Sequence, residues 1–566
     1  MRARLHPTIL VAILIASTLC SAVPADTYPR VVGVDVLEYI FRVELTDEND
    51  VIEGLTTVDV RFDRAGVTEL PLDLISLSAD AVTGMTVSGV WVADAHAGRQ
   101  ASAVRPPEED LGAAVRFVHE ADRLQISLPS PSTPDQRLFV TVAYSGKPEA
   151  GLEIGDTKHG DRSFFSENWP NKARHWLPTL DHPYDKAKGR MVVVAPSHYQ
   201  VVSNGLLVEE TDLDHSTRMT VWKQSVPIST WLYTLGVAHF AVQSLDEFDG
   251  KPVQTWVYSK DRDAGFRDFA VPTHDVLAFF SERIGPYSYE KLANIQSNSV
   301  GGGMESASAI FYGDDSVTGE RTAHWRNIIT HEIAHQWFGN AVTESDWDDV
   351  WLSEGFATYF THLFIEHAYG REDFVAGMQR DRERIFEYYE EHPDYRLVHD
   401  NLDDMSEVLT RMQYIKGSWT LHMLRGIIGT ETFWSGIRDY YSLYRDGHAS
   451  TTDFRRVMEE AAGRDLGWLL EQWLYQGGLP VVEGTWSHDP DTSTVQLRLT
   501  QTQETGYEFR LPITVRVHSA EGSNSDMLVD LAAERGHFTL EVEGKPTKVE
   551  LDPDTWVLMR SSLQEK

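Results

Sequence analysis

Residues 330–340 read THEIAHQWFGN, and this stretch decides the fold of the central part of the chain. Apolar residues recur at helical spacing from 322 to 338, so the stretch is expected to lie on a helix. Residues four apart on a helix lie one above the other, so His331 and His335 point in the same direction and can share one metal ion. Glu332 then lies beside the open side of that metal.

A third ligand for the same metal is expected from a neighbouring helix. The next such segment reads WLSEGFA over residues 351–357, and its Glu354 stands nineteen positions after His335. Two histidines and one glutamate leave the fourth position of a tetrahedral zinc ion open for water, which is the arrangement of a hydrolytic site rather than a structural one. The pattern therefore predicts one Zn²⁺ per chain, held by His331, His335 and Glu354. The alternative is that the two histidines lie on a polar helix face without a metal.

The same helical spacing extends through the middle of the chain. Apolar residues repeat with a helical period over 352–368, 432–444 and 452–462, and glycines at 339, 370, 447 and 463 are expected to end helices. The sequence therefore predicts a mostly helical region that begins near residue 270.

Alternation of apolar and polar residues indicates β-structure on both sides of this helical region. Half-buried antiparallel strands are expected at 39–45, 124–128 and 139–144, and shorter apolar runs at 191–194 and 231–237 continue the pattern to about residue 243. Alternation returns after residue 480, at 495–499, 513–517 and 538–542. A small β-sandwich should therefore close the chain.

The composition is that of an ordinary globular protein, and its charge excludes one class of partner. Of the 566 residues, 42% are hydrophobic and 24% are charged. The chain carries 50 Lys and Arg against 86 Asp and Glu, a formal net charge of −36. Such a surface repels a polyanion, so we expect no nucleic-acid partner.

The first 25 residues have the pattern of a secretory signal peptide. A basic start, MRARLH, precedes an apolar run of about a dozen residues, TILVAILIASTL, and small residues that end in VPA at 23–25. The apolar run is shorter than the ~20 residues needed to cross a bilayer, so no membrane span is expected in the mature chain. Cys20, the only cysteine, would leave with the signal, which excludes cysteine catalysis. The sequence predicts a secreted or periplasmic protein.

The motifs together resemble those of the aminopeptidase N and leukotriene hydrolase family of zinc enzymes. Besides residues 331–340 and 351–357, the resemblance includes GGMES at 302–306, which is similar to the family's exopeptidase motif, GPY at 285–287 and YIKG at 414–417. It covers most of the span from about residue 160 to about residue 480.

The resemblance implies a multidomain α+β fold. Its parts are a signal peptide at 1–25, an N-terminal antiparallel β-saddle domain at 26–243, a thermolysin-like, mostly helical catalytic domain at 244–476 and a C-terminal β-sandwich domain at 477–566. The independent reading of periodicity leads to the same order of β, helical and β regions.

The resemblance also implies residues that bind the substrate. Glu305 would bind the free N-terminal amine of a peptide, because a carboxylate in the substrate pocket selects chain ends. Gly302 and Gly303 would permit close backbone contact with the substrate, and Met304 would line the pocket for the first side chain. Upstream, Glu167 is the expected second ligand of the amine, in SENWP ahead of an Ala-Arg pair.

Two further residues are expected to act on the reaction itself. Glu332 would accept a proton, as general base, from a water activated by zinc as that water attacks the peptide carbonyl. Tyr414, by resemblance, would stabilise the tetrahedral oxyanion opposite the metal. The sequence departs from the family's pattern at Gly303 and Ser306, where Ala and Asn are usual, and at Ser353, where Asn is usual.

The combined expectation is a zinc-dependent aminopeptidase that hydrolyses N-terminal residues from peptides with a free N-terminus. A thermolysin-type zinc endopeptidase would share the histidines and the zinc glutamate but would not need Glu305. An epoxide hydrolase that acts on a lipid is a further enzymatic alternative, on kinship alone. A catalytically silent, zinc-containing peptide-binding protein is an alternative from another class, and Glu332 and Tyr414 argue against it.

Overall fold

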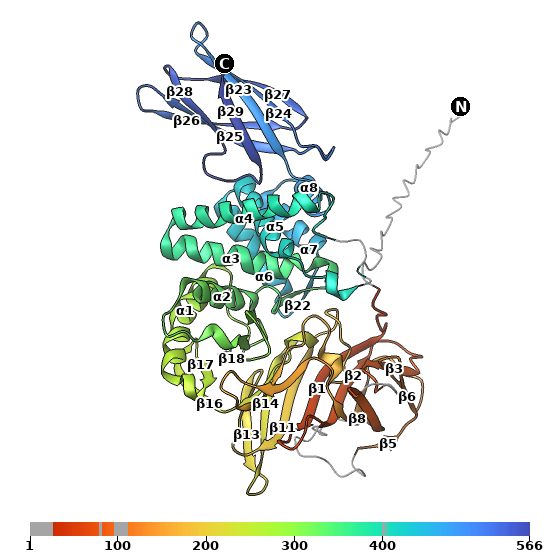
Figure 1. The fold of residues 1–566 in the computed structure, drawn as a ribbon. Coiled ribbons are helices and arrows are strands. Elements are labelled where there is room, and N and C mark those ends of the chain that lie inside the picture. Colours follow the sequence, from red (N-terminus) through yellow and green to blue (C-terminus); the bar gives the residue numbers. More distant parts are fainter. Residues whose placement is uncertain (1–26, 78–81, 96–110, 399–401, 403) are drawn as a thin grey trace, which may run out of the picture.

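A computed structural model describes residues 27–77, 82–95, 111–398, 402 and 404–566. Three parts follow one another along its length: a β-rich N-terminal part, a mostly helical middle, and a two-sheet C-terminal part at the opposite end (Figure 1). One continuous hydrophobic cluster contains buried residues of all three, from Val34 to Met559. This order confirms the expected multidomain α+β architecture. The predicted signal peptide, with Cys20, lies outside the described residues.

An eight-stranded sheet forms most of the N-terminal part. In spatial order its strands are β13 (Leu206–Asp212), β14 (Thr217–Ile228), β11 (Ala187–Pro196), β1 (Val34–Glu44), β2 (Ile52–Phe62), β8 (Gln136–Lys147), β4 (Gly84–Asp94) and β5 (Ala113–Ala114). All neighbours are antiparallel except β1 and β11, which run parallel. The sheet expected to be antiparallel is therefore mixed at this one pair, because the long chain between β1 and β11 allows a crossover connection.

Two smaller antiparallel sheets complete this part. One contains β3 (Glu69–Asp73), β7 (Arg123–Ser127) and β6 (Phe117–Glu120), and the other β12 (Gln200–Ser203), β15 (Leu235–Ala238), β10 (Arg162–Ser166) and β9 (Leu152–Asp156). The strand predicted over 231–237 is only partly correct, because residues 230–232 form a 3-10 turn and β15 begins at Leu235. Trp231 packs instead against Trp169 and Trp347, with ring centroids 5.6 and 5.1 Å away.

The middle part begins with a five-stranded sheet. Its strands in spatial order are β16 (Phe240–Phe248), β17 (Lys251–Tyr258), β18 (Leu292–Gln296), β20 (Ala309–Tyr312) and β19 (Gly303–Met304). Strand β16 runs through the domain boundary predicted at 243/244 and pairs with β17 from end to end. Strand β19 lies at the edge of the sheet and contains the centre of the GGMES motif.

Helices make up the rest of the middle part. Those described are α1 (Arg262–Arg283), α2 (Ala323–His335), α3 (Trp351–Tyr369), α4 (Arg371–Glu391), α5 (Arg411–Ile428), α6 (Thr430–Tyr444), α7 (Thr451–Ala462) and α8 (Gly467–Leu474). A short parallel pair, β21 (Val342–Glu344) and β22 (Gly447–Ala449), lies among them. None of the helices in the described ranges has both the length and the apolar character that a membrane crossing requires.

The predicted helices at 352–368, 432–444 and 452–462 correspond to α3, α6 and α7. The helix predicted over 322–338 ends earlier, at His335, and Gly339 then turns the chain with a φ of 106°. Gly370 and Gly463 end helices as expected, whereas Gly447 lies in β22 after α6 has already ended at Tyr444.

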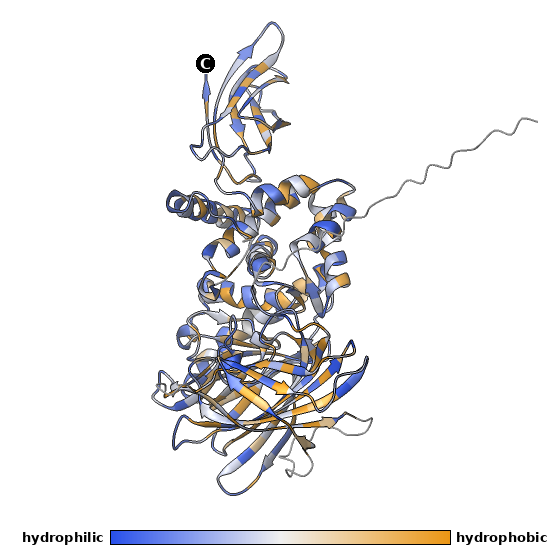
Figure 2. Cartoon of the chain, turned by 90° about the vertical axis from the view of Figure 1, so that its right-hand side faces the viewer, coloured by the Kyte–Doolittle hydropathy of each residue, from blue (hydrophilic) through white to orange (hydrophobic). Residues whose placement is uncertain are grey.

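Two sheets form the C-terminal part. One contains β27 (Arg535–Glu541), β24 (Thr494–Gln501), β23 (Val481–Asp489) and β29 (Arg560–Glu565), and the other β26 (Asn524–Leu531), β25 (Leu511–Ser519) and β28 (Pro546–Leu551). Every second residue of β25 is buried from Leu511 to Val517, and Figure 2 shows polar and apolar residues alternating along these strands. The predicted C-terminal β-sandwich is confirmed.

Candidate active site

Helices α2 and α3 bring the three predicted metal ligands together. His331 and His335 lie one turn apart on α2, and Glu354 lies in the first turn of α3. Nε2 of His335 lies 3.0 Å from Nε2 of His331, and Oε2 of Glu354 lies 3.2 Å from each of these nitrogens. Three donor atoms from two helices thus converge on one point.

This donor set fits a zinc ion. Ligand atoms about 2.0–2.1 Å from a tetrahedral zinc lie about 3.3 Å apart, which is close to the three separations found here. A single proton cannot satisfy two imidazole nitrogens and a carboxylate oxygen at once, whereas a single cation can. Burial alone would raise the pKa of Glu354, but His335 and hydrogen bonds with both imidazoles lower it to about 2. The carboxylate is therefore ionised and able to bind a cation.

The ring of His335 is held from its other side. Its Nδ1 lies 3.2 Å from the carbonyl oxygen of Phe338 and 3.1 Å from Oγ of Ser353. An imidazole that binds a metal through Nε2 carries its proton on Nδ1, so both oxygens can accept that proton and orient the ring. Gly339 allows the close approach, since a Cβ there would lie 2.3 Å from Oγ of Ser353. Ser353, which stands where the family pattern has Asn, thus contacts the metal-ligand candidate His335 directly.

The GGMES motif is fixed by side chains of Gln336 and Asn340, which follow the two histidines in the sequence. The backbone oxygen of Glu305 accepts hydrogen bonds from Nε2 of Gln336 at 2.8 Å and from Nδ2 of Asn340 at 2.7 Å. Oε1 of Gln336 accepts from the backbone nitrogen of Ser308 at 3.0 Å. Carboxylate oxygens of Glu305 and Glu332 and a ring nitrogen of His335 all lie within 4.8 Å of one another. The Glu305 carboxylate is therefore part of the same centre.

Glu332 lies against strand β19. A Cβ at residue 303 would lie 2.3 Å from Oε1 of Glu332, so Gly303 lets the backbone pass directly over this carboxylate. Burial raises the pKa of Glu332 well above its usual range, the charge of His335 opposes this shift, and Glu305 and Glu354 add to it. A carboxylate that takes up a proton more readily than usual is suited to general acid–base work.

Tyr414 extends from α5 to the same centre. Its ring is stacked on that of His331, with centroids 5.8 Å apart and planes 22° from parallel. Burial raises the pKa of Tyr414 well above its usual range, and the charges of Glu354, Glu305 and Glu332 raise it further. The phenol therefore keeps its proton and can donate a hydrogen bond.

Glu167 comes from the N-terminal part of the chain, and both of its carboxylate oxygens already have a partner in the protein. One carboxylate oxygen accepts from the backbone nitrogen of Trp169 at 3.0 Å, and the other is paired with Nζ of Lys172. A substrate ammonium would therefore share this carboxylate with Lys172, a partner that the sequence analysis did not identify.

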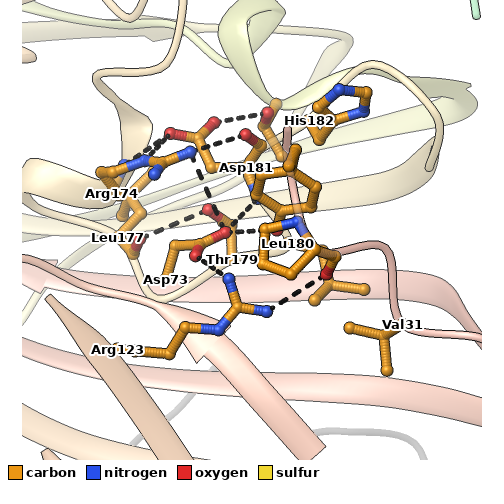
Figure 3. A network of polar contacts seen from close by, with 12 residues as sticks. Val31, Asp73, Arg123, Arg174, Leu177, Thr179, Leu180, Asp181 and His182 are labelled. Atoms are coloured by element: carbon orange, nitrogen blue, oxygen red, sulfur yellow. Dashed lines mark hydrogen bonds and ion pairs between the residues drawn. The ribbon is translucent and has the colours of Figure 1, made fainter. Parts of the chain in front are cut away.

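A buried polar network holds the chain that follows Glu167 (Figure 3). Nε of Arg174 donates to Oδ2 of Asp181 at 3.0 Å. Asp73 accepts from the backbone nitrogen of Asp181 at 2.9 Å and pairs with Nη1 of Arg123 at 2.8 Å. The network ties this segment to β3 and β7, so the N-terminal part presents Glu167 to the site from a fixed support.

One cavity of about 700 Å³ connects these side chains. All the site residues predicted from the sequence line it: Glu167, Gly302, Gly303, Met304, Glu305, His331, Glu332, His335, Glu354 and Tyr414. Their roles remain predictions, but their meeting at one cavity is a property of the structure.

The cavity also has a wall that the sequence analysis missed. It is formed by α3 and α4 and includes Thr358, Thr361, His362, Asp381 and Arg384. The first three follow Glu354 at i+4, i+7 and i+8 and so share its face of the helix, a signal the sequence did contain. The two residues of α4 belong to no motif.

Two family models match long parts of this chain. Residues 37–232 match the peptidase M1 N-terminal domain, and residues 272–473 match the peptidase family M1 domain. Glutamyl aminopeptidase of Homo sapiens is 29% identical over 375 residues, which are 62% of this chain and 39% of that protein. Probable aminopeptidase 1 of Saccharolobus solfataricus is 29% identical over 324 residues, 55% of this chain and 41% of that protein. The chain spans about two fifths of the length of these curated relatives.

A solved structure shares the fold. The crystal structure of an M1 zinc metallopeptidase from Deinococcus radiodurans covers 79% of this chain and 95% of its own, with a TM-score of 0.63 and 22% sequence identity. The likeness extends over most of the three-part architecture described above.

Proposed function

This chain belongs to peptidase family M1, a family with zinc metallopeptidases among its members, and we propose that it is a zinc-dependent aminopeptidase. It would release the N-terminal residue of peptides that have a free amino group. The relatives with a similar sequence are named as aminopeptidases, which supports the proposal.

The observation that carries this proposal is the position of the Glu305 carboxylate. A carboxylate oxygen of Glu305 lies within 4.8 Å of one of the general-base candidate Glu332 and of a ring nitrogen of His335. In a peptide, the amino nitrogen and the carbonyl carbon of the same residue are only about 2.5 Å apart. A carboxylate this close to the reacting centre can bind the ammonium of the residue being removed, and leaves room for one residue before the scissile bond.

His331, His335 and Glu354 would hold the zinc ion, which when bound makes water more acidic and polarises the substrate carbonyl. The chain's own residues perform the remaining work. Glu332 accepts the proton of the attacking water and can return it to the leaving nitrogen, since burial favours its protonated form. Tyr414, which keeps its phenolic proton, donates a hydrogen bond to the oxyanion that develops on the substrate carbonyl.

Glu305 distinguishes this activity from that of an endopeptidase, and Glu332 with Tyr414 distinguishes it from a silent binding protein. An endopeptidase places an amide, not an ammonium, at this point, and the carboxylate of Glu305, a residue only 6% exposed, would then be left without a counter-charge. A silent binding protein has no need for Glu332 and Tyr414 beside the metal ligands, yet both line the cavity.

The test uses alanine p-nitroanilide and a panel of related aminoacyl amides with the purified full-length mature chain. We expect turnover that is lost on treatment with a chelator and restored by one equivalent of Zn²⁺ per chain. Absence of turnover on every free aminoacyl amide, with zinc bound, would remove the aminopeptidase assignment.

We further propose that the mature enzyme acts outside the cytoplasm, in the periplasm or the medium. The basic, apolar and small-residue pattern of residues 1–25 supports this. Intact-mass analysis of the exported protein should give a chain that begins at Asp26. Recovery of the full 566-residue chain from the cytoplasm alone would contradict it.

A further inference from the structure

The wall of the cavity formed by α3 and α4 carries a charged cluster that the proposed reaction does not use. Nε2 of His362 lies 2.8 Å from Oδ2 of Asp381, and the other oxygen of Asp381 lies 3.6 Å from Nη1 of Arg384. The side chains of His362 and Asp381 are 11% and 10% exposed, whereas that of Arg384 is 61% exposed. A buried pair thus supports a guanidinium group that lies open to the cavity.

The buried pair is rigid. Residue 377 on α4 is glycine, and a Cβ there would lie 2.8 Å from both Cε1 and Nδ1 of His362. The imidazole therefore packs directly on the backbone of α4, and its contact with Asp381 fixes that carboxylate. Among the described residues Arg384 is paired only with Asp381, and the contact is weak because it is 3.6 Å long and the Arg384 side chain is 61% exposed. Its guanidinium can turn to another carboxylate without loss of a strong contact.

The charges around the cavity are asymmetric. Its acidic lining residues are Glu167, Glu305, Glu332, Glu354 and Asp381, and Arg384 is the only lysine or arginine among the described residues that line it. Glu305 therefore provides a negative charge beside the metal ligands, and Arg384 provides a positive charge on the α3–α4 wall. A short peptide with free ends carries the complementary pair, an ammonium and a carboxylate.

The length of this wall sets the size of the peptide. The cavity-lining residues of α3 are Glu354, Thr358, Thr361 and His362, and the last lies eight positions after the first along the helix. At 1.5 Å per residue this is about 12 Å. An extended peptide spans about 3.3–3.6 Å per residue, so the wall corresponds to about three residues.

We propose that Arg384 binds a substrate carboxylate that lies two or three residues beyond the scissile bond, so that tripeptides and tetrapeptides with a free C-terminus are the preferred substrates. The inference rests on the proposed aminopeptidase function and names its substrate class. Arg384 is the residue that contacts the substrate, and the buried pair of His362 and Asp381 forms the cavity wall beside it.

The test compares the wild type with Arg384→Gln on peptides that end in a free carboxylate or in an amide. Trialanine and tetraalanine, each as the free acid and as the C-terminal amide, are offered to the wild type and to Arg384→Gln, and the release of alanine gives kcat/KM. Arg380→Gln is the matched control, because Arg380 is exposed on the same helix one turn earlier and does not line the cavity. The amides of Ala-Ala-Glu and Ala-Ala-Gln form a further pair, which shows whether a side-chain carboxylate is bound in the same way.

We expect the wild type and Arg380→Gln to prefer the free acids at least 10-fold, mainly through KM, and Arg384→Gln to prefer them less than twofold. If Arg384 can also bind a side-chain carboxylate, the wild type should prefer Ala-Ala-Glu amide to Ala-Ala-Gln amide. Arg384→Gln should then lose this preference. An acid-to-amide ratio near one in the wild type, or an unchanged ratio in Arg384→Gln, overturns the inference. Failure of the wild type on every peptide and on alanine p-nitroanilide would instead refute the proposed function.

Discussion

Removal of the hydroxyl of Ser353 tests how the metal site is built without altering any metal ligand. Oγ of Ser353 lies 3.1 Å from Nδ1 of His335, and the only other contact of that nitrogen given by the described residues is the Phe338 carbonyl oxygen at 3.2 Å. Ser353→Ala therefore leaves the His335 ring with one acceptor instead of two. We expect the ring to be less well oriented and zinc to bind more weakly.

The size of this effect follows from the contacts. A hydrogen bond of this kind contributes about 0.5–1.5 kcal/mol, and loss of a group that orients a metal-bound histidine typically weakens metal binding about 10–100-fold. Because the Phe338 carbonyl oxygen still accepts a hydrogen bond from His335, the loss of zinc affinity should lie at the lower end of this range of about 10–100-fold. We expect the dissociation constant for Zn²⁺ to rise about 10-fold, with little change in turnover per zinc-loaded molecule.

Competition with a chromogenic zinc chelator measures this constant without reference to activity. Ser418→Ala is the matched control, because Ser418 is a fully buried serine on α5 whose hydroxyl has no hydrogen-bond partner within the described chain. A dissociation constant for Ser353→Ala within twofold of the wild type would refute the positioning role. An equal rise in Ser418→Ala would assign the effect to general loosening of the domain.

Three further changes have expected outcomes. Glu332→Gln should keep zinc at one equivalent by elemental analysis and lose at least ~10²-fold in kcat, because the residue moves a proton and is not a ligand; loss of zinc would contradict this role. Tyr414→Phe should reduce kcat by roughly 10²–10³ with little change in ground-state binding of a substrate-like inhibitor; a near wild-type kcat would assign the oxyanion to another donor. Burial raises the pKa of Asp185 to about 8, and the charge of Asp35 adds to the shift. The folded chain thus retains a proton that the unfolded chain releases above about pH 4, so stability falls from about pH 4 to about pH 8. Asp185→Asn should therefore raise the midpoint of thermal unfolding more at pH 8.5 than at pH 5, and an equal shift at both would refute the argument.

The metal site could be predicted from the sequence because its geometry is local. His331 and His335 are related by the helical repeat alone, and Glu354 follows them in a motif at the start of the next long helix. The strands at 495–499 and 513–517 could also be predicted locally, since every second residue of each is buried.

What the sequence did not show depends on packing between distant segments. Strands β18 and β20 are buried at every residue, so they lack the alternation that identifies a half-exposed strand. The pairing of Glu167 with Lys172 and the approach of α4 to His362 likewise arise only when the parts of the chain are in place. The α3–α4 wall was missed because Asp381 and Arg384 come from a helix that carries no motif.

The central claim is that Glu305 binds the ammonium of the residue being removed. The most direct test is the ratio of kcat/KM for one tetrapeptide with a free N-terminus and the same peptide with an acetylated N-terminus, measured with the zinc-loaded wild type. Acetylation removes the positive charge and leaves a buried carboxylate without a partner, which costs at least about 2 kcal/mol. We therefore predict that the free peptide is cleaved at least about 30-fold more efficiently, with release of its first residue. Equal cleavage of the two peptides, or cleavage of the acetylated peptide at an internal bond, would contradict the account and favour a zinc endopeptidase.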